Sequence, residues 1–410
     1  MTSNRLHPVN DRLIHLDVLR GFALFGILLV NFEWFLRPMQ AIMLGSEPGL
    51  SPLDQITDIL VTTFGEGKFY PLFSILFGAG YALMAERALK RAAPFWGLYL
   101  RRVLILAGFG LIHTILIWGG DILLIYAVSA LIMILLFRKT PERRLWKWAL
   151  FFISIPVILA WMLGGSMSLL NQVDPEAYSS AMSEIVQSNE RVLTEITQAK
   201  QVHASGSLTD NIRLRIDDTI FKFKFFLFWA TPIIGYFLLG RWLIVSDRLL
   251  NPVEHAMYFR RWRSRGLLLG LLASALATGL MRNVSANLPT LDAALGSTLV
   301  IYGGLLLALG YLSAIVLSAE RLRFLAPVGQ MALTNYLAQS LVWTWVIYGY
   351  GLGLWGELPR WSSVPLAVAF FGLQVIFSRW WVARYRFGPA EWLWRTLTYG
   401  ERQSMRLEST

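Results

Sequence analysis

The chain of 410 residues contains no cysteine, and only 15% of its residues are charged. Without cysteine it can form no disulfide, no thiolate nucleophile and no Cys-ligated metal site. Soluble domains carry nearer about a quarter of charged residues, so an ordinary soluble protein is excluded. Apolar residues take the place of the missing charges: 55% of the chain is hydrophobic and its mean hydropathy is +0.51. The composition predicts an integral membrane protein.

The common catalytic and cofactor motifs are missing as well. There is no GxSxG nucleophile elbow, no HExxH motif and no phosphate-binding loop. Residues 351–356 (GLGLWG) match the spacing of a dinucleotide-binding turn, but they follow an apolar helix and not a strand. The 5 histidines are scattered along the chain, so no metal site is expected. Any catalysis would have to use a base embedded in the membrane.

Apolar runs cover nearly the whole length of the chain, and about ten of them are long enough to cross a bilayer at roughly 20 residues per span. The fold is therefore predicted to be all-α and polytopic. The runs cover approximately residues 18–36, 69–86, 97–118, 122–137, 147–165, 225–245, 266–282, 297–318, 328–349 and 362–382.

Most Lys and Arg residues fall in alternate loops between these runs. Because basic loops stay on the cytoplasmic side, both termini are predicted to be cytoplasmic. The same asymmetry explains the formal charge of +11, so no nucleic-acid partner is expected.

We divide the chain into a first five-helix membrane bundle (1–165), an extracytoplasmic helical insertion (166–224), a second five-helix bundle (225–383) and a cytoplasmic C-terminal segment (384–410). The pattern of residues 175–204 is typical of a surface helix. The insertion is too small for an enzyme domain of its own, and we expect it to cover the outer mouth of the bundle.

The candidate catalytic residues are His113 and Asp121. Residues 111–126 have the pattern of one membrane helix ending, a Gly119-Gly120 turn, and the next helix beginning. An ionisable residue inside an apolar span is costly to keep, which makes it a functional hypothesis. Imidazole exchanges protons near neutral pH, and a carboxylate can orient it. Two alternatives stay open: Asp121 is placed to cap the second helix, and His113 could be a hydrogen-bonded core residue.

Other polar residues inside the runs are candidate ligand-binding groups. Asp17, Arg20 and Asn31 share one face of the first run, although Asp17 and Arg20 also have the spacing of an intrahelical ion pair. Arg101 and Arg102 lie at the cytoplasmic end of the third run. Their expected role is either to anchor the helix at the membrane surface or to form a cationic clamp for a phosphorylated cytoplasmic ligand.

The ninth run carries Asn335 and Gln339 four residues apart on one helix face. They are candidates for ligand binding, or for hydrogen bonds between helices. Lys68 stands in the polar lead-in to the second run. In the seventh run, small residues recur every fourth position and predict close helix packing: Gly266, Gly270, Ser274 and Thr278.

Five stretches carry a resemblance to a known family: residues 16–23 (LDVLRGFA), 68–80 (KFYPLFSILFGAG), 113–121 (HTILIWGGD), 329–336 (GQMALTNY) and 388–395 (GPAEWLWR). In this order they resemble the YeiB family of bacterial inner-membrane proteins, which implies that location. The first spans are similar to transmembrane acyltransferases that include the lysosomal heparan-glucosaminide N-acetyltransferase. Those enzymes pass an acyl group from cytosolic acyl-CoA to a sugar on the far side. Their proposed acyl-accepting histidine follows the first span, whereas residues 37–60 here contain none.

The resemblance implies an acyltransferase. For that function we expect acyl-CoA to enter from the inner side with its phosphates near Arg101 and Arg102, and Lys68, Asn335 and Gln339 to line the path. His113, oriented by Asp121, would then deprotonate an acceptor hydroxyl or amine; that role is inferred here and not carried over from the family.

The expected partners are membrane lipids and a glycan acceptor, with a homodimer left open. A transporter or lipid-linked carrier translocase, using the same polar groups as a path, is the alternative. A structural or partner subunit is the third class considered.

Overall fold

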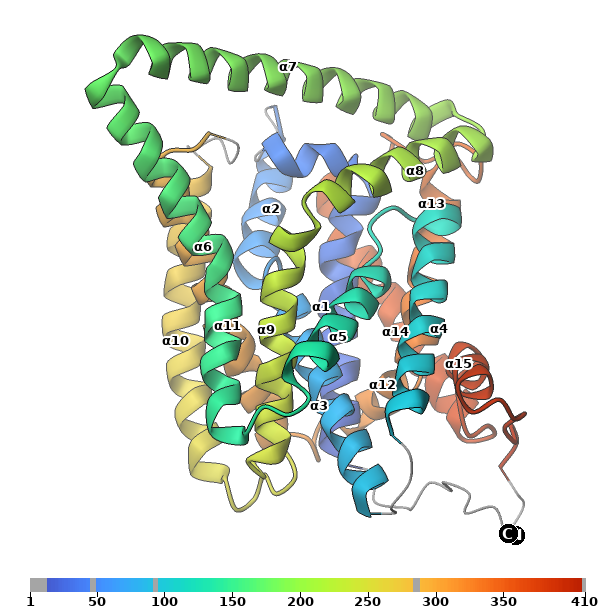
Figure 1. The fold of residues 1–410 in the computed structure, drawn as a ribbon. Helices are drawn as coiled ribbons and strands as arrows, with labels where there is room; N and C mark the ends of the chain where they lie inside the picture. The colour runs from blue at the N-terminus through green and yellow to red at the C-terminus, as the bar shows by residue number, and fades with distance from the viewer. Residues whose placement is uncertain (1–12, 45–48, 91–94, 283–287, 408–410) are drawn as a thin grey trace.

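The computed structural model describes residues 13–44, 49–90, 95–282 and 288–407. Helices make up most of this part of the chain (Figure 1), and it contains no β-strand, only an isolated bridge between Tyr385 and Arg406. The prediction of an all-α protein is confirmed.

The helices up to the insertion are, in order, α1 (Ile14–Phe35), the 3₁₀ helix η1 (Met39–Leu44), α2 (Pro52–Phe64), α3 (Phe69–Lys90), α4 (Trp96–Ile112), the π-helical turn η2 (His113–Ile117), α5 (Leu123–Phe137) and α6 (Glu142–Val173). The insertion contains α7 (Pro175–Ser205) and α8 (Leu208–Lys224). The remaining helices are α9 (Phe226–Val245), α10 (Ala256–Met281), α11 (Leu291–Leu317), η3 (Arg323–Leu325), α12 (Ala326–Gln330), α13 (Ala332–Ile347), η4 (Arg360–Ser362), α14 (Ser363–Val382) and α15 (Pro389–Tyr399).

Eight helical stretches among the described residues are long and apolar enough to cross a membrane. They contain α1, α2 with α3, α4 with η2, α6, α9, α10, α11 and η4 with α14. The prediction of a polytopic membrane protein is confirmed. The helices α5 and α13 occupy two further predicted spans but have only 15 and 16 residues, less than the roughly 20 that a full crossing needs. The number of ten spans and the cytoplasmic position of both termini stay predictions. Residues 1–12 and 408–410 lie outside the described ones.

The second predicted span is the second half of a broken helix. The stretch Pro52–Lys90 divides into α2 and α3 at residues 65–68, where Gly67 has a φ of +78°. Lys68 is buried in this break, and its Nζ donates to the carbonyl oxygen of Thr62 at 2.7 Å. The ammonium group therefore satisfies one of the backbone acceptors that the end of α2 leaves open.

Helices from before and after the insertion pack together in one bundle: α1 lies against α12, α13 and α14, and α3 lies against α9. At the α3–α9 crossing the backbones touch. A Cβ added to Gly78 would lie 2.0 Å from the carbonyl oxygen of Phe237, and one added to Gly240 would lie 1.9 Å from that of Ile75. Only glycine fits at these two positions.

The predicted packing face of the seventh run is confirmed. Gly266 and Gly270 contact the backbone of α11 around residues 306–310, and Ser274 and Thr278 are buried. α10 and α11 therefore form a close helix pair.

The insertion crosses one end of the bundle, opposite the end where α15 lies (Figure 1). The predicted surface helix is confirmed by α7. It begins where Asp174 accepts the N–H of Ala177 and Pro175 takes the first helical position. α8 begins with a capping box of Ser207 and Asp210 and returns beneath α7 to α9 (Figure 1).

Candidate functional site

The turn between α4 and α5 holds the His113–Asp121 pair. α4 ends in the π-helical turn, in which the N–H of Trp118 bonds to the carbonyl of His113 at 2.8 Å; such turns occur frequently at functional sites. His113 is fully buried, and its Nδ1 lies 2.8 Å from Oδ1 of Asp121. Oδ2 of Asp121 accepts the N–H of Leu124 at 2.8 Å, in the first turn of α5. Asp121 thus caps a helix and holds the imidazole at the same time.

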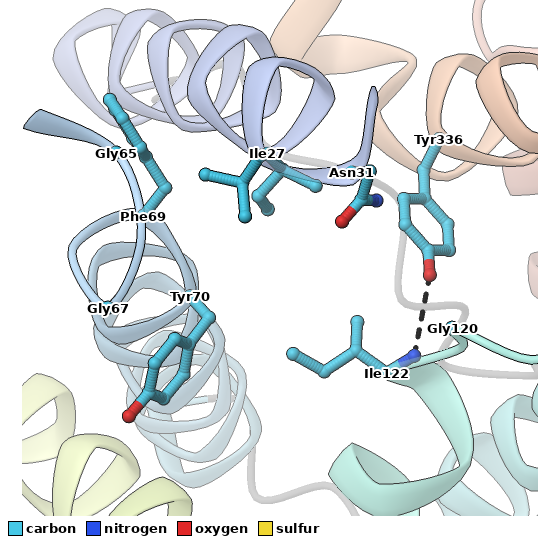
Figure 2. A pocket seen from close by; sticks show the side chains of 10 residues that line it. Ile27, Asn31, Gly65, Gly67, Phe69, Tyr70, Gly120, Ile122 and Tyr336 are labelled. Atoms are coloured by element: carbon cyan, nitrogen blue, oxygen red, sulfur yellow. Dashed lines mark hydrogen bonds between the residues drawn. The ribbon is translucent and has the colours of Figure 1, made fainter. Parts of the chain in front are cut away.

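The second ring nitrogen of His113 is not held by Asp121. Its Nε2 is buried and has no hydrogen-bond partner among the described residues. When the Asp121 carboxylate accepts the Nδ1 proton, the lone pair lies on Nε2, which is the form that a general base needs. The ring of Tyr336 lies 5.1 Å from the imidazole, centroid to centroid, and its hydroxyl accepts the N–H of Ile122 at 3.4 Å (Figure 2).

A cavity of about 90 Å³ lies beside this turn. Its wall comes from α1, the α2–α3 break, the start of α3, the α4–α5 turn and α13. It consists of Ile27, Val30, Asn31, Gly65, Gly67, Phe69, Tyr70, Gly120, Ile122 and Tyr336. Figure 2 shows the side chain of Asn31 facing Tyr336 and Ile122 across this space. Since a water molecule takes about 30 Å³, the cavity accommodates a small organic group but not a nucleotide.

The polar stripe of α8 contacts the same turn. We define this stripe as Asn211, Arg215, Asp218 and Lys222, which repeat at helical spacing; the first three are buried and Lys222 is half-buried. Arg215 donates to the carbonyl of Leu116 at 2.9 Å, and Lys222 donates to that of Gly119. Carbonyl groups at the end of a helix find no hydrogen-bond donors inside that helix. Here Arg215 and Lys222 of α8 act as the donors.

The polar stripe also makes hydrogen bonds with α7 and with the segment after α1. Oδ1 of Asp218 accepts from Nε2 of Gln40, and burial raises the pKa of the Asp218 carboxyl to about 6 against the opposing effect of Lys222. Nδ1 of His203 lies 2.8 Å from Oδ1 of Asn211, and burial lowers the pKa of the His203 imidazole to about 4. A histidine kept neutral in this way has a packing role.

Of the predicted ligand-binding residues, the structure brings Asn31 to the cavity beside the turn. Asp17 and Arg20 form the i,i+3 ion pair at 2.8 Å. Lys68 binds the end of α2, as described above. Arg101 and Arg102 lie in the first half of α4, about 16 to 18 Å along the helix axis from His113 at 1.5 Å per residue. Arg101 is exposed, whereas the guanidinium carbon of Arg102 lies 3.6 Å from the ring centroid of Trp394.

Asn335 and Gln339 take part in a buried network between α13 and α14. Asn335 donates to Ser378 Oγ at 3.0 Å, and Gln339 donates to Oε1 of Gln374 at 2.9 Å. Nε2 of Gln374 returns a bond to the carbonyl of Asn335. The interhelical alternative is thus present in the structure, and a role of these two amides in binding a ligand stays a prediction.

Three of the five stretches that carried the family resemblance, residues 16–23, 329–336 and 388–395, join α1, α12, α13 and α15 through direct contacts. A Cβ on Gly329 would meet the carbonyl oxygen of Asp17 at 1.9 Å, so α12 and α1 touch through their backbones. The carboxylate of Glu391 accepts the N–H groups of Leu333 and Thr334 and the Thr334 hydroxyl, at 2.6, 3.1 and 2.6 Å. These motifs therefore hold α1, α13 and α15 in register.

Several residues of the site were not predicted from the sequence: the polar stripe of α8, Gln40, Tyr336 and the π-helical turn. The spacing of the stripe was a readable signal, because its members repeat every three to four residues on one helix face. Within the described residues, no group of three or more His, Asp or Glu side chains is placed to hold a metal ion.

These features define a class: an all-helical, polytopic membrane protein with a buried histidine–aspartate pair close to a small cavity. The chain is 33% identical over 420 residues to the uncharacterized protein YxaH of Bacillus subtilis, covering 97% of both chains. It is 29% identical over 399 residues to the uncharacterized protein YeiB of Escherichia coli, covering 95% of this chain and 96% of YeiB. The chain belongs to the family of YxaH and YeiB, as its motifs predicted.

Residues 244–401 match the family model described as a protein of unknown function (DUF418). No solved structure matches the chain.

Proposed function

We propose that the protein is a transmembrane acyltransferase of the bacterial cytoplasmic membrane, taking an acyl group from cytosolic acyl-CoA to an acceptor hydroxyl or amine on the outer side. One observation carries the proposal: a buried imidazole is held by a carboxylate at 2.8 Å, and its other nitrogen makes no hydrogen bond to any residue that the structure describes. This is the arrangement of an oriented general base.

The proposed reaction needs one proton acceptor and one acyl carbonyl. Nε2 of His113 takes the proton from the acceptor hydroxyl or amine, whose oxygen or nitrogen then forms a bond to the thioester carbonyl carbon. The carbon–sulfur bond breaks, and the thiolate of coenzyme A leaves and takes up a proton. The cavity beside the turn fits the acyl end of the donor only, because about 90 Å³ is too small for the nucleotide. Asn31, whose side chain faces the cavity, is a candidate for positioning the carbonyl.

The donor's phosphates would then be bound towards the far end of α4. There Arg101 is exposed, while Arg102 is stacked on Trp394. Arg101 is therefore the better candidate for contact with the phosphates, and Arg102 for fixing α15 to α4.

The test uses purified protein in liposomes, with radiolabelled acyl-CoA of increasing chain length on one side and sugar or amine acceptors on the other. His113→Ala is expected to lower acyl transfer by about 10²–10⁴-fold, the range for loss of a general base. The matched control is His255→Ala, since His255 is a partly exposed histidine paired with Asp247. Full transfer by His113→Ala would overturn the mechanism, and no transfer from any acyl-CoA by the wild type would overturn the function.

A transporter is the second candidate, and the broken helix favours it. Discontinuous helices mark the binding sites of many transporters, and here the break at residues 65–68 carries Glu66 between two glycines that line the cavity. The same liposomes separate the two functions. Movement of an unchanged solute without acyl-CoA would support transport, and a covalently acylated product would support transfer.

A further inference from the structure

α8 is amphipathic in the inverted sense. Its polar stripe, defined above, faces the protein, and Ile216, Ile220 and Phe223 on the opposite side are 39, 58 and 50% exposed. A helix at a water boundary normally buries its apolar face and exposes its charges. Exposing the apolar side of α8 to water would cost free energy. This side is therefore expected to face a medium other than water.

The exposed apolar residues continue onto neighbouring helices. Below α8, Leu111, Ile112 and Leu116 of the α4–η2 span are exposed, and η2 packs directly against α8. After α8, Phe228 and Trp229 begin the next span and are exposed as well. Spans of this kind face lipid, so the apolar side of α8 continues an existing lipid-facing surface.

The residue types at the end of α8 suit the membrane interface. Phe221, Phe223 and Phe225 are exposed, and the exposed Lys224 stands among them. Interfacial helices place aromatic and aliphatic side chains in the boundary between acyl chains and headgroups, with lysines at headgroup level. Nearer the start of α8, Arg213 is exposed, so only the C-terminal half has this character. The exposed Asp217 lies between Ile216 and Ile220 and adds a second charge near headgroup level.

We propose that the C-terminal half of α8 lies in the outer leaflet of the bilayer, with Ile216, Ile220 and Phe223 against acyl chains and Lys224 at the lipid phosphates. α8 is then a wall between lipid and the His113–Asp121 turn, because its opposite side binds the carbonyls of Leu116 and Gly119. This interaction surface is independent of whether the protein transfers acyl groups.

The absence of cysteine from the chain makes the test direct, because each introduced cysteine is a unique attachment point. Ile216→Cys, Ile220→Cys and Phe223→Cys are spin-labelled in liposomes of phosphatidylethanolamine and phosphatidylglycerol. Collision with oxygen, which concentrates in lipid, is compared with collision with a water-soluble nickel chelate. Arg213→Cys on the same helix is the aqueous control, and Leu104→Cys on the exposed side of α4 is the lipid control.

The expected result is that the α8 labels resemble Leu104→Cys, with oxygen collisions several-fold more frequent than at Arg213→Cys. Labels as accessible to nickel as Arg213→Cys would overturn the proposal. Labels shielded from both reagents, with spin–spin broadening between copies, would also overturn it and would identify a second chain as the occupant. All positions are exposed, so none of the substitutions removes a buried contact, and elution as a single species checks folding.

Discussion

The two contacts of Asp121 allow its roles to be separated by a single pair of substitutions. In Asp121→Asn the amide oxygen can still accept the N–H of Leu124, so α5 keeps its cap. The amide nitrogen, however, donates to Nδ1 of His113 and forces the ring proton onto Nε2. In that tautomer Nε2 has no lone pair with which to take a proton from the acceptor.

The expected magnitudes follow from these contacts. Asp121→Asn should leave the free energy of unfolding within about 1 kcal/mol of the wild type and lower acyl transfer by about 10²–10⁴-fold. Asp121→Ala should show the same loss of transfer and a further loss of stability of about 0.5–2 kcal/mol, the usual cost of a removed cap. The assays are initial rates of acyl transfer in liposomes and thermal unfolding in detergent. Wild-type rates with Asp121→Asn would refute the reasoning, as would wild-type stability with Asp121→Ala.

Three further predictions concern stability and are all measured by thermal unfolding. Glu391→Ala removes a carboxylate that accepts three hydrogen bonds, and it should cost about 3 kcal/mol; an unchanged midpoint would contradict the capping role. Gly329→Ala should cost about 1–3 kcal/mol by overpacking, whereas Gly372→Ala, whose new Cβ meets nothing within 4 Å, should be neutral or stabilising by up to about 1 kcal/mol. Since the pKa of His203 is lowered to about 4 when folded, stability should fall as pH drops from about 6.5 towards 4. The loss is about 2 kcal/mol at pH 5, and His203→Gln should remove it.

The membrane class and the His113–Asp121 pair could be predicted because their signals are local. Apolar runs indicate spans directly. His113 and Asp121 are separated by seven residues that include the Gly-Gly turn, so both lie near the junction of the two helices. The resemblance motifs could be recognised too, although their contacts could not. Gly329 against Asp17 and Glu391 at the start of α13 join positions far apart in the sequence.

The remainder of the site depends on contacts between distant segments. Arg215 and Lys222 donate to carbonyl groups about a hundred residues earlier in the chain. The residue types at positions 116 and 119 give no indication that their carbonyl groups need donors from elsewhere. The π-helical turn creates that need, and it has no sequence signature of its own. The cavity likewise requires five segments of the chain to come together. The inverted pattern of α8 was visible in the sequence, but in a segment read as water-exposed.

The contact of α3 with α9 at Gly78 and Gly240 restricts how this molecule can change shape. Where side chains separate two helices, rotamers can readjust as the helices slide. Where main chain rests on main chain, there is little to readjust. α3 precedes the insertion and α9 follows it. If the helices before the insertion tilted as a rigid body against those after it, α3 and α9 would have to separate. A carrier that alternates between inward and outward states would need to open that crossing, whereas chemistry at a fixed site would leave it closed.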